Sequence, residues 1–271
     1  MPFKNEPPSK PALTRVADWL ALLASGLLIM LFLLFHTEDV RHDRHLGIAL
    51  AITLAFALVG RLSHGVSRSG AIAGAVVAFL MASRDLRMFW ILLIIFAVTL
   101  AATRLGRTQK KQLRVAESDR GRSASQVIAN LGIAGVIMAI PSFAAWRILV
   151  LAALAEAAAD TTSSEIGTAF PGRTVLISTW RTVSPGIDGG ISLRGTAAGL
   201  LAATTIAISG LALALTTTTE AIAIAGAGTL GMLIDSLLGA TLEKRRYLNN
   251  DLVNLFGTAS AVMVAWLIAT I

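Results

Sequence analysis

The chain has 271 residues, of which 55% are hydrophobic and only 14% are charged, and its formal net charge is +7. Soluble domains carry about 25% charged residues, so this composition excludes an ordinary soluble protein and indicates a polytopic membrane protein. The absence of cysteine excludes disulfides and thiolate metal sites. Because basic residues of membrane proteins usually mark cytoplasmic loops, we expect no nucleic-acid partner.

Apolar runs separated by charged or turn-forming stretches predict an all-α membrane protein with nine transmembrane helices. They are, in chain order, Val16–Phe35, Leu46–Gly60, Gly70–Ala82, Met88–Thr103, Ser123–Phe143, Arg147–Gly167, Gly195–Leu215, Glu220–Leu242 and Asp251–Ile271. We expect a polar tail, residues 1–15, and one transmembrane domain, residues 16–271. The first run is expected to be a retained span, because no small-residue cleavage site follows it.

The second and third runs, residues 46–60 and 70–82, are shorter than the roughly 20 residues that a spanning helix needs. A re-entrant pair is the alternative for these two segments, and this alternative leaves seven to nine spans.

The basic residues predict the orientation of the helices. If the N-terminus lies in the cytoplasm, the cytoplasmic segments contain 18 of the 23 Lys and Arg residues, and the opposite side contains five. This asymmetry agrees with the positive-inside rule. We therefore expect a cytoplasmic N-terminus and an outward-facing C-terminus, with most basic residues of Arg104–Arg122, including Lys110 and Lys111, acting as solvated topology signals.

In this orientation the polar residues gather in the cytoplasmic halves of the helices. Glu156 and Asp160 lie four residues apart on one helix face, and Glu165 follows near the end of the same run. Further candidates are Asp235 in the eighth run, Asn250, Asp251 and Asn254 in the ninth, Arg122, Gln126 and Asn130 on one stripe of the fifth, and Asp188 in a loop. Each acidic residue near a helix centre costs ~2.5–3.5 kcal/mol, which favours a shared functional cavity.

These residue types predict a phosphoryl-transfer site. Carboxylate and amide oxygens without thiolates suit Mg²⁺ or Mn²⁺, and nearby arginines such as Arg173, Arg181 and Arg194 suit phosphates. The glycines of "PGIDGGISLRG" let the backbone approach a phosphate closely, although this segment is not a Walker A loop. The alternatives are structural: Glu156 and Asn130 bond neighbouring helices, and the hydroxyls of Thr161–Ser164 bond their own helix.

Five segments, in order, resemble an integral-membrane family that contains the plant and cyanobacterial phytyl-phosphate kinases and the animal transmembrane protein nineteen. They are "GRSASQVIANLG", "AEAAADTTSSEIGT", "SPGIDGGISLRGTAAGLLAA", "IDSLLGATLE" and "NNDLVN". A fainter resemblance connects Asp160, Ser164, Gly167 and the following glycine-rich turn to polyprenol, dolichol and phytol kinases and to CDP-diacylglycerol synthases. Those enzymes commonly have Lys where this chain has Arg173 and Arg181.

The resemblance implies transfer of a phosphoryl group, from CTP as the expected nucleoside triphosphate, to an isoprenoid monophosphate such as phytyl phosphate. The residue pattern and the resemblance together give the catalytic candidates Asp160, Asp235, Glu156, Glu165 and Asp188, and the Mg²⁺ or Mn²⁺ ligands Asp160, Asp235, Asp251 and Asn250. Together they also give the candidates for phosphate binding, which are Arg122, Asn130, Ser164, Arg173, Arg181, Gly189, Gly190, Arg194 and Asn254. The expected partners are the lipid bilayer, the nucleotide and the isoprenoid phosphate, in a multi-pass prokaryotic plasma or thylakoid membrane, and a homo-oligomer stays open.

Two other function classes remain open from the sequence. Acidic membrane residues also build cation or proton pathways, so a coupled transporter is one alternative. Another Mg²⁺-dependent isoprenoid enzyme, such as a prenol kinase, a prenyltransferase or a phosphatase, is the other. The outer halves of the runs contain few polar residues, and no "DDxxD" pair is present, which disfavours both classes.

Overall fold

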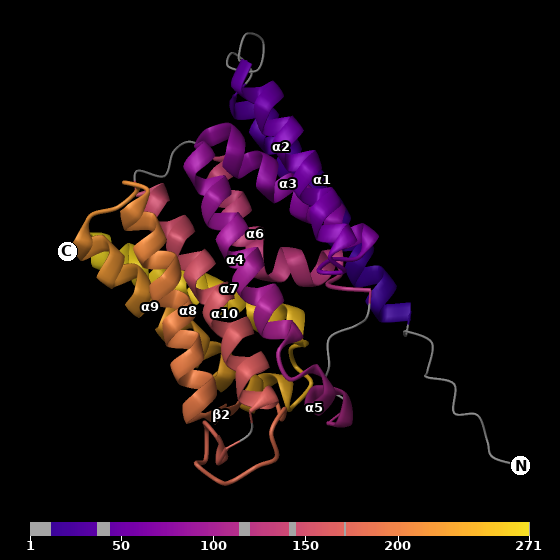
Figure 1. The fold of residues 1–271 in the computed structure, drawn as a ribbon, viewed down its shortest axis with the longest axis vertical. Coiled ribbons are helices and arrows are strands. Elements are labelled where there is room, and N and C mark those ends of the chain that lie inside the picture. The colour runs from indigo at the N-terminus through magenta and orange to yellow at the C-terminus, as the bar shows by residue number, and fades with distance from the viewer. Residues whose placement is uncertain (1–11, 37–43, 114–119, 141–144, 171, 271) are drawn as a thin grey trace, which may run out of the picture.

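The computed structural model describes residues 12–36, 44–113, 120–140, 145–170 and 172–270, and this part of the chain is almost entirely helical (Figure 1). The helices are α1 (Ala12–Phe35), α2 (Arg44–Leu62), α3 (Arg68–Arg84), α4 (Leu86–Arg104), α5 (Arg107–Gln112), α6 (Ala124–Ala139), α7 (Trp146–Ala169), α8 (Leu193–Ala212), α9 (Thr218–Leu238), the π-helical turn η2 (Gly239–Glu243) and α10 (Asn250–Ala269). The long helices fall on the predicted runs, so the all-α membrane fold is confirmed.

Within the described residues, six helices are long and apolar enough to cross a membrane, which is fewer than the nine predicted. Helices α3 and α6 have only 17 and 16 residues, and the 24 residues of α7 include four charged side chains. The two short runs form separate helices that pack against each other, and α2 is among the six candidate spans. The membrane orientation of the whole bundle stays a prediction.

Helix α7 lies at the centre of a group of helices formed by α4, α6, α8, α9 and α10. Every residue from Leu149 to Ala159 is buried, because α4, α6, α8, α9 and α10 all pack against this helix. Small residues let the neighbouring backbones approach closely: a Cβ atom added to Gly228 of α9 would lie 2.7 Å from Cβ of Ala155. The central helix therefore carries Glu156, Asp160 and Glu165 into the interior of the bundle.

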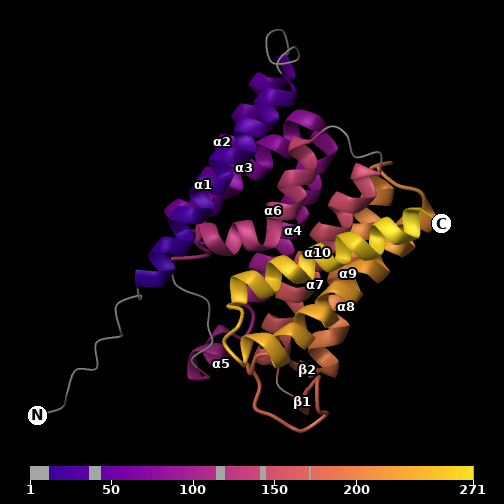
Figure 2. The same ribbon diagram turned by 180° about the vertical axis from the view of Figure 1, so that it is seen from behind.

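A small antiparallel hairpin connects α7 to α8. Strand β1 (Thr174–Leu176) pairs with strand β2 (Gly190–Ser192), with Val175 opposite Ile191. Both views show this hairpin and α5 at the same end of the molecule (Figures 1 and 2). The hairpin begins directly after the acidic half of α7, which places the glycine-rich segment beside that helix end.

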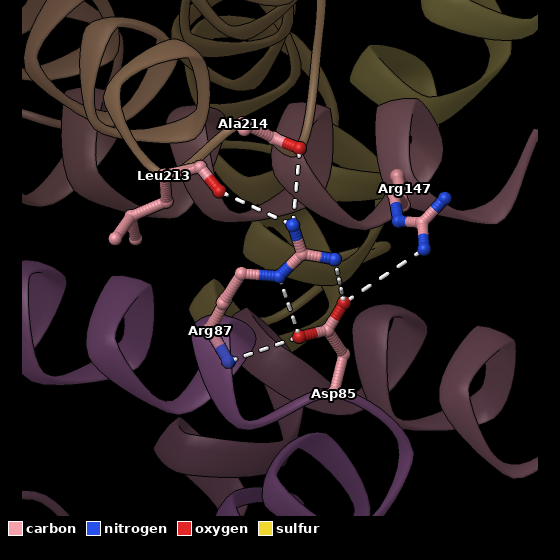
Figure 3. A network of polar contacts seen from close by, with 5 residues as sticks. All are labelled: Asp85, Arg87, Arg147, Leu213 and Ala214. Atoms are coloured by element: carbon pink, nitrogen blue, oxygen red, sulfur yellow. Dashed lines mark hydrogen bonds and ion pairs between the residues drawn. The ribbon is translucent and has the colours of Figure 1, made fainter.

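A network of charged residues joins the N-terminal ends of α4 and α7 (Figure 3). Asp85 caps α4 by accepting from the Arg87 backbone N–H at 3.0 Å, and its carboxylate also pairs with the Arg87 guanidinium at 2.8 Å. Arg147 of α7 lies 3.8 Å from the same carboxylate. Arg87 donates to the carbonyl oxygens of Leu213 and Ala214, so this network connects α4 to α7 and to the end of α8.

We expect Asp85→Asn to lower the melting temperature at neutral pH, because Asn keeps the helix cap but removes the charge. Burial raises the pKa of Asp85, but the hydrogen bonds and charges of Arg87 and Arg147 outweigh it and lower the pKa below its ordinary value of 3.8. The stabilisation is therefore complete above about pH 4 and is lost as the pH falls through the folded-state pKa. Thermal unfolding in detergent at pH 7 and pH 3 checks this, and an equal loss at both values would contradict it.

Candidate active site

A polar cavity of about 210 Å³ lies where the ends of four helices meet the β1–β2 hairpin. The C-terminal ends of α7 and α9 and the N-terminal ends of α6 and α10 form its walls. Its lining includes the predicted site residues Arg122, Asn130, Asp160, Ser164, Glu165, Asp188, Gly189, Gly190, Asp235, Asn250 and Asn254. The structure thus brings together residues that are spread over more than 130 positions of the chain.

Asp160 of α7 and Asp235 of α9 lie at the inner part of this cavity. Their carboxyl groups are close enough to share a hydrogen bond, and the charge of Arg122 acts on Asp160. The Oδ2 atom of Asp235 is buried and has no hydrogen-bond partner among the residues that the structure describes. Two adjacent carboxyl groups with an unpartnered oxygen form a ready site for a positively charged ligand.

Glu156 lies one helical turn before Asp160 and is fully buried behind the cavity lining. Its Oε2 atom accepts a hydrogen bond of 2.8 Å from the Thr258 hydroxyl of α10, so this residue does bond a neighbouring helix. Its Oε1 atom has no hydrogen-bond partner in the described part of the chain. A Cβ atom added to Gly257 would lie 2.6 Å from this Oε1 and 3.1 Å from Oδ2 of Asp235, so the two unpartnered oxygens lie beside each other.

Arg122 and Asn130 enter the cavity from α6. Arg122 is held by backbone hydrogen bonds to Gly65 and Ser67, in the loop between α2 and α3, and the next residue begins α6 with a capping box. Asn130 is buried, and its amide nitrogen donates to the Gln126 carbonyl at 2.9 Å. No described residue donates a hydrogen bond to the Oδ1 atom of Asn130, so this atom remains able to accept a hydrogen bond or to bind a cation.

The glycine-rich segment closes the cavity from the hairpin side. Gly189 has φ +74°, a left-handed conformation that side chains rarely adopt. A Cβ atom there would overlap both the backbone and the side chain of Ala240 in η2. The carbonyl of Gly189 accepts from the Ile177 N–H at 3.0 Å, and the Gly190 N–H donates to Ile187 at 2.8 Å. The segment is therefore packed directly onto the helix end that follows Asp235.

Glu243 is a cavity residue that the sequence analysis missed. It follows Asp235 by eight residues, ends η2, and lies near enough to Asp188, Asp160 and Asp251 to interact electrostatically with all three. The three basic residues that follow it, Lys244, Arg245 and Arg246, make this segment resemble a solvated basic loop. Its spacing of two helical turns from Asp235 was the available signal, since such residues share a helix face.

Several predicted residues do not line the cavity. Arg173, Arg181 and Arg194 are exposed, and Arg194 donates to the Phe170 carbonyl at 3.4 Å. Asp251 is partly buried near Glu243 but outside the lining. Among the described residues, Arg122 is therefore the arginine that the structure places at the cavity, and phosphate binding by the other three stays a prediction.

The prediction that Lys110 is a solvated topology signal is wrong. Only 1% of Lys110 is exposed, and its ammonium donates to Glu165 at 2.6 Å and to the carbonyls of Ala102 and Thr103. The turn at Gly106, with φ +61°, folds α5 back so that Lys110 reaches the last turn of α4. Glu165 lines the cavity, so the Lys110 ammonium holds a cavity carboxylate in place. The same ammonium also provides hydrogen bonds to backbone carbonyls at the C-terminal end of α4.

We expect Lys110→Met to reduce the free energy of unfolding by about 3 kcal/mol, because it leaves Glu165 without its cation. Denaturation of the purified protein in detergent checks this value. The matched control is Lys111→Met, which changes an exposed position of the same helix and is expected to have little effect. Adding Glu165→Gln to Lys110→Met is expected to recover part of the loss, and equal losses at Lys110 and Lys111 would contradict the buried ion pair.

Comparisons with known proteins agree with this architecture. The model of the "Integral membrane protein DUF92" family matches residues 51–262. An uncharacterized membrane protein of Methanocaldococcus jannaschii is 32% identical over 226 residues, which cover 82% of this chain and 94% of the relative. Protein VTE6, chloroplastic, of Arabidopsis thaliana is 31% identical over 209 residues, or 71% of this chain and 63% of the relative.

A third relative, Protein PGR of Arabidopsis thaliana, is 29% identical over 206 residues, which cover 65% of this chain and 71% of the relative. No solved structure matches the chain. The family match extends from α2 to α10 and includes every helix that lines the polar cavity. The chain is therefore a multi-pass membrane protein that belongs to the DUF92 integral membrane family.

Proposed function

We propose that this protein is a membrane prenyl-phosphate kinase, which transfers the γ-phosphoryl group of a nucleoside triphosphate, with CTP as the expected donor, to an isoprenoid monophosphate. The observation that carries the proposal is the polar cavity, in which Asp160 and Asp235 face Arg122 and a glycine-rich loop. Acidic residues for a cation, beside an arginine for phosphate, are the groups that phosphoryl transfer requires. The resemblance to phytyl-phosphate kinases supports the same reaction.

The residues present fit a bound Mg²⁺ or Mn²⁺. The unpartnered oxygens of Asp235 and Asn130 are of the type that these ions prefer, and the carboxyl group of Asp160 lies beside Asp235. Among the described residues, no three Asp, Glu or His side chains form a complete metal cage. Mg²⁺ commonly uses one or two carboxylates together with substrate phosphates, and when bound it would neutralise charge on the transferring group.

The chain's own residues would align two phosphates. An oxygen of the isoprenoid monophosphate forms a bond to the γ-phosphorus of the triphosphate, and the bond from this phosphorus to the β-phosphate oxygen breaks, which releases a nucleoside diphosphate. The attacking phosphate is already ionised, so no residue needs to remove a proton. Arg122 would bind phosphate oxygens, and the backbone around Gly189 and Gly190 would border the donor, so that positioning and charge provide most of the rate.

The structure of α7 favours an enzyme over a transporter. A cation pathway requires polar groups along the whole helix, whereas the seven residues from Leu149 to Ala155 are apolar and buried. Beyond Arg147 in its first turn, the polar groups of this helix begin at Glu156 and continue toward the cavity. No histidine is among the residues that line this cavity, which disfavours a phosphatase that uses a histidine nucleophile.

The direct test is to incubate the purified protein with phytyl phosphate, CTP and Mg²⁺, and to measure formation of phytyl diphosphate. ATP, GTP and UTP in parallel identify the donor, and phytol in place of phytyl phosphate distinguishes a prenol kinase. Release of free phosphate from phytyl phosphate without a nucleotide would instead indicate a phosphatase. Absence of any phosphorylated product with every nucleotide would overturn the proposal.

A further inference from the structure

A second, larger cavity of about 440 Å³ lies beside the polar one, among α2, α3, α4 and α6. Its volume is within the range of about 300–1,000 Å³ that is typical of small-molecule sites. Aromatic and branched side chains of α2, α4 and α6 form its apolar wall, and these residues are Phe56, Leu92, Ile95, Phe96, Leu100 and Leu131.

Small residues on two helices create the space. Ala71, Gly74 and Ala75 of α3 share one helix face, and Ala57 and Gly60 of α2 also line the cavity. A Cβ atom added to Gly74 would have no other heavy atom within 4 Å. The lining residues of α4 extend from Leu92 to Arg104, which corresponds to a length of roughly 18 Å at 1.5 Å per residue. The cavity is therefore long and apolar.

The two cavities share three lining residues of α6 and its N-terminus, namely Arg122, Gln126 and Asn130. The apolar cavity also reaches basic residues at its loop end, His64, Arg104 and Arg107. Arg104 donates to the Ser63 carbonyl at 2.7 Å, which holds the end of α4 against the loop between α2 and α3. A molecule that occupied both cavities would thus have an anionic head near Arg122 and a hydrocarbon tail along α4.

We propose that the apolar cavity binds the tail of the isoprenoid monophosphate and that its length and width set which tails are accepted. This inference rests on the proposed function and adds the tail site to it. The continuity with the polar cavity supports a single-chain amphiphile, because its phosphate reaches Asp160 and Asp235 while its tail stays among apolar residues. Residues of α3 and α4, far from the phosphates, therefore determine substrate selection.

The sharpest test narrows the cavity at Gly74. Gly74→Leu places a larger side chain into open space on a helix, where Leu is also the better helix former, so the fold is expected to survive. We expect the kcat/KM ratio of phytyl phosphate to geranyl phosphate to fall at least about tenfold, since a single methylene in an apolar pocket already changes selectivity by such factors. The matched control is Gly226→Leu on α9, where a Cβ atom also meets nothing within 4 Å and the position is outside both cavities.

A binding measurement separates failure of this inference from failure of the proposed function. A benzophenone-tagged farnesyl phosphate is expected to crosslink to α3 or α4, and Gly74→Leu or the second variant Ala75→Leu is expected to reduce this labelling. Specific labelling without any turnover would support the tail site and overturn the kinase. If both variants turn over substrate with unchanged tail selectivity, the tail site is overturned and the kinase proposal stands. The same conclusion follows if phosphatidylglycerol displaces the labelling and phytyl phosphate does not.

Discussion

Replacement of either Asp160 or Asp235 by asparagine is expected to lower turnover of phytyl phosphate by at least about 10²–10³-fold, with the fold intact. Asn keeps the size and one carbonyl oxygen of each side chain but removes the charge that would balance a divalent cation. The two carboxyl groups lie beside each other in the polar cavity, and Oδ2 of Asp235, which has no hydrogen-bond partner among the described residues, is free to bind such a cation. Loss of either charge should therefore have a similar effect.

The fold is expected to survive these changes because neutral side chains are less costly than unpaired carboxylates within a membrane. Initial rates at saturating CTP, together with melting temperatures in the same detergent, check both parts of the prediction. Glu156→Gln is the informative comparison, since Glu156 bonds Thr258 behind the lining and should affect stability more than turnover. Wild-type rates in Asp160→Asn would remove Asp160 from the mechanism, and early melting of this variant would assign it a structural role.

The helices were predictable from the sequence because apolar length is the dominant signal in a membrane protein. Each of the nine apolar runs corresponds to a helix of at least 16 residues in the described part of the chain, including the two short runs, 46–60 and 70–82. The shared depth of Asp160 and Asp235 was also predictable, since charged residues within spans are costly and tend to lie together. The hairpin and α5 were not predicted, because strands of three residues and a helix of six produce no periodic pattern.

The composition could not show which individual basic residues form buried contacts and which remain exposed. Counting Lys and Arg treats every loop residue alike, whereas the structure buries Lys110 against Glu165 and leaves Arg173, Arg181 and Arg194 exposed. The left-handed turn at Gly106 decides which lysine of α5 points inward. Such a tertiary contact spans 55 residues, so no local pattern could have revealed it.

Gly189→Ala is expected to reduce turnover about 100-fold while leaving the helices intact. The variant combines two penalties: alanine is strained at φ +74°, and its methyl group would overlap Ala240 of η2. The loop must therefore move away from η2, which begins four residues after Asp235 and ends at Glu243. A displacement of about 1 Å in a positioning element already costs about 10²-fold in rate.

Because Gly189 borders the cavity that would hold the donor, the loss should appear mainly as a higher KM for CTP and a lower kcat, with a smaller change in KM for phytyl phosphate. Steady-state kinetics with each substrate varied in turn checks this division. Gly172→Ala is the control, since a Cβ atom there meets nothing within 4 Å and the residue lies outside the cavity lining. If Gly189→Ala kept the wild-type kcat and KM, the packing of this loop onto η2 would have no role in phosphoryl transfer.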